Sequence, residues 1–294
     1  MSAPGSLDAL RHRLRELDRL VVAFSGGVDS ALLTFVAHDT LGTERVVAAT
    51  AVSASLAPSE LESARTWAAE LGIRWVGVET DEASRPEYVA NGVDRCFHCK
   101  SALMDGLAPL AAAEDATVVL GVNVDDLGDH RPGQHAAAAA GAVFPLVDAG
   151  FTKAHVRDAA RLLGLEVWDK PAAACLASRL PYGTPVTMGT LSRVAAAEDA
   201  LRTLGFAQVR VRHYGDLARI EVEPAELRAA VAARESVVGA VKAAGYRYVT
   251  LDLEGFRSGN LNDGVVPVSA PGAVSALTPA GPQSPASVPQ ASTA

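Results

Sequence analysis

Apolar runs and amphipathic stretches alternate along the first half of the chain. Short runs rich in valine and bounded by turn residues predict strands at Leu20–Phe24, Val46–Val52, Arg74–Glu79 and Thr117–Val122. Stretches rich in alanine, leucine and glutamate predict helices at residues 7–20, Ala31–Leu41, Pro58–Leu71 and Lys100–Ala113. A last unit is expected to complete the sheet: strand Phe144–Val147, helix Lys153–Leu163 and strand Glu166–Trp168. This alternation predicts an α/β fold with a doubly wound, mostly parallel sheet.

The pattern changes after about residue 180. It predicts a helix, two strands, a long helix and a final strand at Leu191–Leu204, Gln208–His213, Ala218–Val222, Pro224–Ala244 and Tyr246–Leu251. We therefore expect one domain over residues 1–180 and a smaller α+β domain over residues 181–264. Residues 265–294 are mostly Pro, Ala, Ser, Gly, Val and Thr, with no periodic apolar face, and we expect a disordered tail.

Composition narrows the class of protein. Hydrophobic residues make up 49% of the chain and charged residues 20%, which is typical of a soluble globular protein. No stretch approaches the length of a membrane span, so we expect a cytoplasmic protein with no membrane partner. The net charge of −8 argues against broad binding to a polyanion such as tRNA.

A glycine-rich loop follows the first predicted strand and precedes a helix. Gly26 and Gly27 let backbone amides approach an anion, and Ser25 and Ser30 add hydroxyl donors next to the positive end of the helix. Asp29 would repel a bare phosphate, so it indicates an intervening Mg²⁺ or capping of exposed amides. The alternative is a strand–helix turn that binds nothing.

This loop resembles the PP-loop of the ATP pyrophosphatase superfamily, which holds the pyrophosphate of ATP and releases AMP and pyrophosphate. The chain lacks the Gly-Lys-Ser/Thr sequence of the ordinary P-loop. The resemblance implies that adenine lies over the end of the next strand, at Thr50, and that Gly121 and Asn123 line the same crevice. Residues 1–180 would then form the ATP pyrophosphatase domain.

Three cysteines, Cys96, Cys99 and Cys175, are too few and odd in number for a disulfide framework. Three thiolates can hold three irons of a 4Fe–4S cluster and leave the fourth iron open. Alternatively, His98 completes a zinc site with them, or the three thiols are unrelated.

Several further segments resemble the LarE family of sulfur transferases. They are Arg95–Lys100, Gly121–Asp126, Asp129–Gly133, Trp168–Pro171, Ala174–Gly183, Ala218–Val222 and Leu251–Gly259. The resemblance covers roughly residues 7–262, and as a set these motifs are more specific than the phosphate loop alone.

The resemblance implies an enzyme that helps to build the nickel-pincer nucleotide of lactate racemase. Its substrate is a carboxylate on a pyridinium mononucleotide, which ATP adenylates before sulfur attacks it. Cys175 matches the sulfur-donating cysteine of the family, and members with three cysteines hold a 4Fe–4S cluster on the positions of Cys96, Cys99 and Cys175. The family also implies a homo-oligomer, with a hexamer as the expected form. We take Cys175, Asp29 and Glu198 as the candidate catalytic residues.

Charged residues in the second half are candidates for the substrate. Arg210, Arg212 and Arg219 lie on the predicted hairpin and would neutralise a mononucleotide phosphate, and the first two share a strand face. The alternative for that face is solvation, and the commoner fate of a helix carboxylate such as Glu198 is exposure. Asp125 and Asp126 either hold Mg²⁺ or cap a loop.

The sequence leaves three other functions open. A tRNA thiolase of the same superfamily also carries three cysteines and an iron–sulfur cluster, although the acidic charge argues against it. An amide-forming synthetase would use ammonia, and its cysteines would be incidental. A nucleotide-sensing module would bind ATP without turnover.

Overall fold

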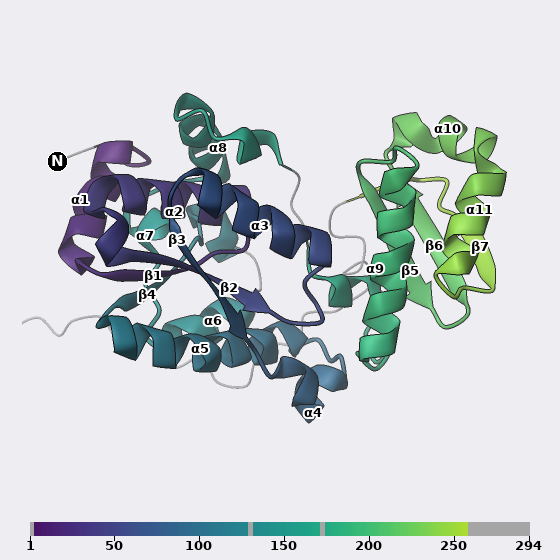
Figure 1. Ribbon diagram of the computed structural model, residues 1–294, viewed down its shortest axis with the longest axis horizontal. Coiled ribbons are helices and arrows are strands. Elements are labelled where there is room, and N and C mark those ends of the chain that lie inside the picture. The colour runs from purple at the N-terminus through teal and green to yellow at the C-terminus, as the bar shows by residue number, and fades with distance from the viewer. Residues whose placement is uncertain (1–2, 129–131, 171–173, 258–294) are drawn as a thin grey trace, which may run out of the picture. The chain divides into compact units, whose positions relative to one another are not determined.

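A parallel sheet forms the centre of the first half of the chain (Figure 1). The computed structural model describes residues 3–128, 132–170 and 174–257. Within them, the sheet has the order β3-β2-β1-β4 and consists of β1 (Leu20–Ala23), β2 (Val46–Val52), β3 (Arg74–Glu79) and β4 (Thr117–Leu120). Leu20 pairs with Val46 on one side and with Thr117 on the other. Because β1 is flanked on both sides and both faces, its sequence is a continuous apolar run.

Helices and short 3-10 turns precede, connect and follow these strands. The α-helices are α1 (Leu7–Leu17), α2 (Val28–Leu41), α3 (Pro58–Glu70), α4 (Pro86–Val89), α5 (Arg95–Glu114), α6 (Pro132–Ala139), α7 (Pro145–Asp148) and α8 (Lys153–Leu162). The 3-10 turns are η1 (Thr43–Arg45), η2 (Glu82–Ser84), η3 (Val124–Gly128), η4 (Glu166–Asp169) and η5 (Leu176–Arg179). Successive residues of β1 face opposite layers: Val22 packs with α1, α2 and α8, whereas Val21 packs with α5. The doubly wound α/β fold is therefore confirmed.

Two predicted strands are wrong. Residues 144–147 enter α7, because Pro145 has no backbone N–H for a strand ladder and suits the first turn of a helix. Only the preceding Val143 forms an isolated bridge, to Val119. Glu166–Trp168 lies in η4, where the Trp168 amide donates to the Leu165 carbonyl at 3.1 Å and closes a turn. A three-residue apolar run is too short for its periodicity to separate a strand from a turn.

A small mixed sheet follows. Its strands are β5 (Val209–Tyr214), β6 (Leu217–Val222) and β7 (Tyr248–Leu251). The helical elements of the same part of the chain are α9 (Met188–Thr203), η6 (Pro224–Glu226), α10 (Leu227–Ala232) and α11 (Arg234–Ala243). β5 and β6 are antiparallel, and β6 and β7 are parallel. The single helix expected over Pro224–Ala244 is divided, and the turn at Ala233 lets Ala230 and Val237 both reach the apolar core of this sheet.

The expected division into domains stays a prediction. Leu176 and Leu180 share one apolar cluster with Val186, Leu191 and Val194, so buried contacts cross the proposed boundary after residue 180. The expected tail over residues 265–294 lies outside the described residues. No helix in the described part of the chain combines the length and apolarity that a membrane crossing needs.

Candidate functional site

The phosphate loop is organised by the hydroxyl of Ser30. Its Oγ accepts a hydrogen bond from the Ser25 amide at 3.2 Å and donates to the Gly27 carbonyl at 3.0 Å. Gly26 has a φ of +72°, which favours glycine, and Gly27 caps α2 without a side chain. Helix α2 begins at Val28, earlier than the sequence predicted, so Asp29 lies in its first turn. The free end of a helix preceded by glycines is suited to anion binding.

Gly121, after the end of β4, packs directly against this loop. A Cβ atom there would lie 2.7 Å from the Ser30 nitrogen and 2.9 Å from the Asp29 carbonyl carbon. Any larger residue would displace backbone rather than a flexible side chain, so only glycine allows the two segments to meet.

Asp29 is held by two partners from later segments. The side-chain amide of Asn123 donates from Nδ2 to Asp29 Oδ1 at 2.9 Å, and the Lys153 ammonium is paired with Oδ2. Asp125 Oδ2 accepts from the Lys153 backbone amide at 2.8 Å, and Asp126 Oδ2 accepts from the Asn123 backbone amide at 3.1 Å. The two candidate magnesium carboxylates thus fix backbone segments on either side of Asp29.

The side chain of Thr50, in β2, bonds to residues on both sides of its strand. It is 2% exposed, and its Oγ1 donates to the Phe24 carbonyl at 2.8 Å and accepts from Trp75 Nε1 at 2.9 Å. The Thr50 hydroxyl therefore ties the end of β1 to β3, beneath the expected adenine position.

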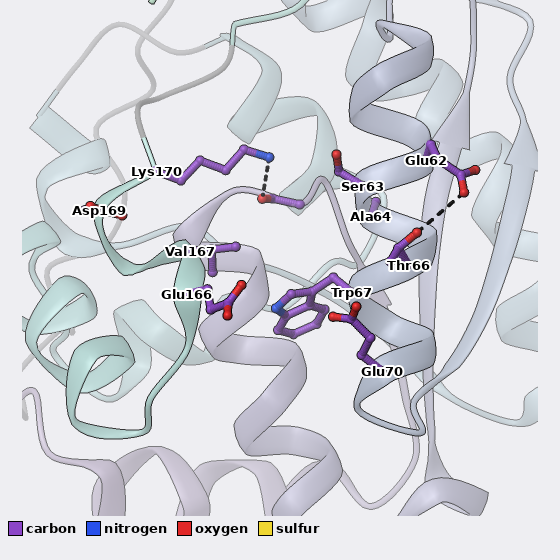
Figure 2. Close-up of a pocket in the computed structure, with 11 residues that line it drawn as sticks. Glu62, Ser63, Ala64, Thr66, Trp67, Glu70, Glu166, Val167, Asp169 and Lys170 are labelled. Carbon is purple, nitrogen blue, oxygen red and sulfur yellow. Dashed lines mark hydrogen bonds between the residues drawn. The ribbon is translucent and has the colours of Figure 1, made fainter. Parts of the chain in front are cut away.

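A cavity of about 550 Å³ lies beside Gly26. Figure 2 shows that residues of α3, among them Trp67, face residues of the η4 segment across it. Lys170 Nζ donates to the Gly26 carbonyl at 3.3 Å and to Glu60 Oε2 at 2.7 Å. The sequence interpretation assigned no role to Lys153 or Lys170. The only available signal was the place of Lys170 in the Trp168–Pro171 motif.

The cysteine motif lies on a helix. Because α5 begins at Arg95 and not at Lys100 as expected, Cys96 and Cys99 are one turn apart. Cys96 and Cys175 are exposed, and Cys99 is half-buried. Burial, followed by the charge of Cys175 and that of nearby groups including Cys96, raises the pKa of the Cys99 thiol to about 12. The three thiols are therefore near enough to interact electrostatically.

The described residues hold no group of three His, Cys, Asp or Glu side chains that could bind a single metal ion. His98, the candidate fourth zinc ligand, lies 3.2 Å from Asp94 on its own helix.

The loop that carries Cys175 is fixed through its backbone. Arg179 Nη1 donates to the Ala174 carbonyl at 2.6 Å and to the Cys175 carbonyl at 3.3 Å. Two other arginines bind further carbonyls of this loop. Arg95 donates to the Ala177 carbonyl and Arg212 donates to the Ser178 carbonyl, both at 2.8 Å. Finally, the Leu176 amide donates to the Ser55 carbonyl at 2.9 Å.

Two of these arginines are also paired with buried glutamates. Arg179 donates to both oxygens of Glu198, at 2.8 and 3.1 Å, and Arg212 to both oxygens of Glu221, at 3.0 and 3.2 Å. Both glutamates are 0% exposed. The expectation that a carboxylate on this helix would be exposed is wrong for Glu198, which also accepts from the Val211 amide at 3.0 Å.

Arg210 is buried without a carboxylate partner among the described residues. It is 8% exposed, lies 4.2 Å from the centre of the Phe256 ring and donates to the Arg257 carbonyl at 3.3 Å. Burial, together with the charges of Arg179 and Arg212, lowers the pKa of Arg210 to about 10.

The strand face that carries Arg210 and Arg212 is therefore buried, and the alternative of a solvated face is wrong. The third candidate, Arg219, pairs with Glu221 at 2.9 Å and with Asp252 at 3.4 Å. The pairs formed by Arg179 and Arg212 leave Arg210 as an additional buried positive charge, which favours an anionic ligand.

Comparison with known proteins shows relatives over most of the chain. The NAD synthase family matches residues 6–90, which include the phosphate loop. The chain is 49% identical over 259 residues to an uncharacterized protein of Synechocystis, with 87% of this chain and 96% of the relative covered. It is 41% identical over 251 residues to the pyridinium-3,5-bisthiocarboxylic acid mononucleotide synthase of Lactiplantibacillus plantarum, with 85% and 91% covered. An uncharacterized protein of Methanocaldococcus jannaschii is 26% identical over 253 residues, with 85% and 96% covered.

Proposed function

The chain belongs to the LarE family, that of the pyridinium-3,5-bisthiocarboxylic acid mononucleotide synthase, and on this premise we propose that it is an ATP-dependent sulfur transferase. Its substrate is a pyridinium dicarboxylate mononucleotide, and its product is the thiocarboxylate from which the nickel-pincer nucleotide is made. The single observation that carries the proposal for this chain is the fixed Cys175 loop beside Arg210, a buried charge that has no carboxylate partner among the described residues.

The first step activates the carboxylate. A carboxylate oxygen attacks the α-phosphorus of ATP, and the bond to the pyrophosphate breaks. The amides at the start of α2, with Ser25 and Ser30, stabilise the pyrophosphate as its charge develops. Mg²⁺ would be held by Asp29, with Asp125 and Asp126 as further candidates, and would supply charge neutralisation.

The second step transfers sulfur. A sulfur nucleophile attacks the acyl carbon, the carbon–sulfur bond forms and AMP leaves with the electron pair of the broken carbon–oxygen bond. Adenylation is needed because oxide is a prohibitive leaving group. Exposure of Cys175 on a fixed loop supports its role as the sulfur-bearing residue.

An iron–sulfur cluster is part of the proposal. Burial raises the pKa of the Cys99 thiol, and the charges of Cys175 and Cys96 raise it further, so the three thiols lie near one another, which supports a shared cluster. Cys96, Cys99 and Cys175 would hold it, and its open iron would supply a binding point for an additional sulfide.

The mononucleotide phosphate is the anion that we assign to the arginines. Arg210 offers an additional buried charge, and Arg212 lies beside it on the same strand face. Arg219 would contribute from the neighbouring strand, where it is partly exposed. Glu198 orients Arg179 and thereby the Cys175 loop.

The test is a reaction with ATP, Mg²⁺ and pyridinium-3,5-dicarboxylic acid mononucleotide. We expect pyrophosphate release that depends on the mononucleotide, and a product in which mass spectrometry finds sulfur in place of one carboxylate oxygen. Asp29→Ala should abolish pyrophosphate release, whereas Asp39→Ala, on the exposed side of the same helix, should not. Sulfur found in tRNA, or an amide formed with ammonia, would overturn the proposal.

Assembly and location are part of the same proposal. We assign the chain to the cytoplasm and to a homo-oligomer, with a hexamer as the expected form and the small second sheet as a contributor to assembly. The support is the family relationship. Analytical ultracentrifugation of the full chain measures the oligomer directly, and a monomer at all concentrations would contradict it.

A further inference from the structure

A buried polar pair lies apart from the phosphate loop and the arginines. Ser55 is 5% exposed and Glu82 3%, and the Ser55 hydroxyl donates to Glu82 Oε1 at 3.2 Å. The second oxygen, Glu82 Oε2, is buried without a hydrogen-bond partner among the described residues. No arginine or lysine in the described part of the chain forms an ion pair with Glu82. A buried acid with half of its hydrogen bonds unmade destabilises a fold, so it indicates a functional reason for its retention.

The pair lies between the end of β2, where the nucleotide is expected, and the Cys175 loop. Ser55 follows β2, near the expected adenine position, and its hydroxyl also lies 2.9 Å from that of Ser53. The backbone carbonyl of the same Ser55 accepts the hydrogen bond from Leu176, the residue after Cys175. One residue therefore contacts Glu82 through its side chain and the Cys175 loop through its main chain.

Two further observations place this junction next to the reacting groups. A cavity of about 400 Å³ is lined by Ser53 and Ala54 after β2, by Leu176 and by residues of α9 such as Leu191. Burial raises the pKa of Tyr88 above its ordinary value, the neighbouring Ser55 hydroxyl opposes this shift, and the charges of Cys175 and Cys99 raise the pKa further. Tyr88 therefore lies close both to Ser55 and to the thiols. The Ser55–Glu82 pair thus lies near the thiols, and the chain neighbours of Ser55, among them Ala54 and Leu56, line a space open to a ligand.

We propose that Glu82 is a positioning residue which, through Ser55, holds the Cys175 loop in register with the nucleotide bound at the end of β2. The inference rests on the proposed function. In the sulfur-transfer step, the attack on the acyl carbon must occur before water reaches the same carbon and releases AMP and the original carboxylate. Holding the Cys175 loop to the segment after β2 favours attack by sulfur over attack by water, without changing how the adenylate is formed.

The experiment separates adenylate formation from sulfur transfer. Ser55→Ala and Glu82→Ala each remove one partner of the 3.2 Å hydrogen bond, Glu82→Gln keeps an acceptor at the same place, and Glu235→Ala removes an exposed glutamate of α11 as the control. We measure pyrophosphate released and thiocarboxylate formed by the full chain. Loss of one buried hydrogen bond should lower the thiocarboxylate made per pyrophosphate about fivefold in the two alanine variants. Glu82→Gln and Glu235→Ala should retain the wild-type ratio.

The outcomes distinguish a positioning role from a structural one. A wild-type ratio in both alanine variants overturns the inference, and so does a parallel fall of both products, because the ratio is then unchanged. A wild type that releases no pyrophosphate with the mononucleotide overturns the proposed function instead.

A second measurement keeps the inference testable in that case. Iodoacetamide labelling of Cys175 is followed with and without α,β-methylene-ATP. We expect a change in rate of about threefold or more in the wild type, and none in Ser55→Ala and Glu82→Ala at saturating nucleotide. An equal change in wild type and variants, or none in the wild type, contradicts the coupling.

Discussion

Arg179 donates two hydrogen bonds to Glu198, of 2.8 and 3.1 Å, while its remaining nitrogen holds the carbonyls of Ala174 and Cys175. A glutamate in the middle of α9 therefore helps to position the loop that carries Cys175. The link runs through one guanidinium, whose planar geometry matches both the carboxylate and the turn.

Glu198→Gln should destabilise the protein. It leaves Arg179, and in part Arg202, without its negative partner in a buried site, so we expect a loss of roughly 3 kcal/mol in the free energy of unfolding. Urea denaturation measures it. Glu235→Gln, at a glutamate that is 89% exposed, serves as the control and should change stability by less than about 0.5 kcal/mol. Equal stabilities for the two variants would contradict the role of the pair.

Arg210→Met should weaken binding of the mononucleotide. If the buried charge of Arg210 binds its phosphate, the KM for the mononucleotide rises about tenfold to a hundredfold, and the KM for ATP stays the same. Arg210→Lys keeps the charge and should recover part of the loss. Arg234→Met, at an exposed arginine of α11, is the control. An unchanged KM in Arg210→Met would remove Arg210 from the phosphate site.

Gly121→Ala should impair ATP binding. The added Cβ would lie 2.7 Å from the Ser30 nitrogen, and the phosphate loop would have to move. We expect the Kd for ATP, measured by calorimetry, to rise about tenfold, which corresponds to about 1.4 kcal/mol and lies within the roughly 1–3 kcal/mol that overpacking costs. Gly189→Ala is the matched change in open space on α9 and should leave the Kd unchanged. A wild-type Kd in both variants would show that the loop tolerates the displacement.

Cys96→Ser together with Cys99→Ser should abolish the iron–sulfur cluster. Removing two of three thiolates removes most of the metal–ligand bonds, so anaerobically prepared protein should lose its brown colour and its iron. Cys175 could then act once as a sacrificial donor, and mass spectrometry would find dehydroalanine there. Dehydroalanine in a cluster-replete wild type would contradict the cluster proposal. Stoichiometric zinc would favour the structural alternative.

Labelling of Cys99 in metal-free protein should depend steeply on pH. Because burial raises its pKa to about 12, the thiolate fraction at pH 8 is small and grows about tenfold for each pH unit up to that value. The same shift makes the fold lose stability above the ordinary thiol pKa, since only the unfolded chain then releases the proton readily. Iodoacetamide rates between pH 7 and 10, resolved by peptide, test this, with exposed Cys96 as the internal control. Equal rates for both thiols would contradict it.

Much of the fold follows from local patterns. The strands β2 and β3 begin and end where the valine-rich runs do, because their periodicity is long enough and their flanks carry turn signals. The strand predicted over Phe144–Val147 was wrong because the apolar residues after Pro145 suit a strand or a short helix equally well, and only Pro145 itself signals the helix. The start of α5 was placed too late, since the arginine, histidine and cysteines before Lys100 carry no apolar periodicity.

The candidate site was predictable where chemistry is local and not where it depends on packing. The phosphate loop is contiguous, so its residues were identified together. Lys153 reaches Asp29 across 124 positions of sequence, and nothing near Lys153 in the chain signals that contact. Burial of Glu198 and Arg210 likewise depends on how α9 and the small sheet pack, which is a property of tertiary structure.

The backbone of the Cys175 loop is held by contacts that do not involve the sulfur atom. Arg179, Arg95, Arg212 and the Ser55 carbonyl all bind main-chain groups of the loop. A chain that has given up the Cys175 sulfur keeps every one of these bonds. In a cluster-free chain such as Cys96→Ser with Cys99→Ser, spent molecules would then melt, migrate and associate like fresh ones, and would dilute the active pool without being recognised as damaged by anything that responds to unfolding.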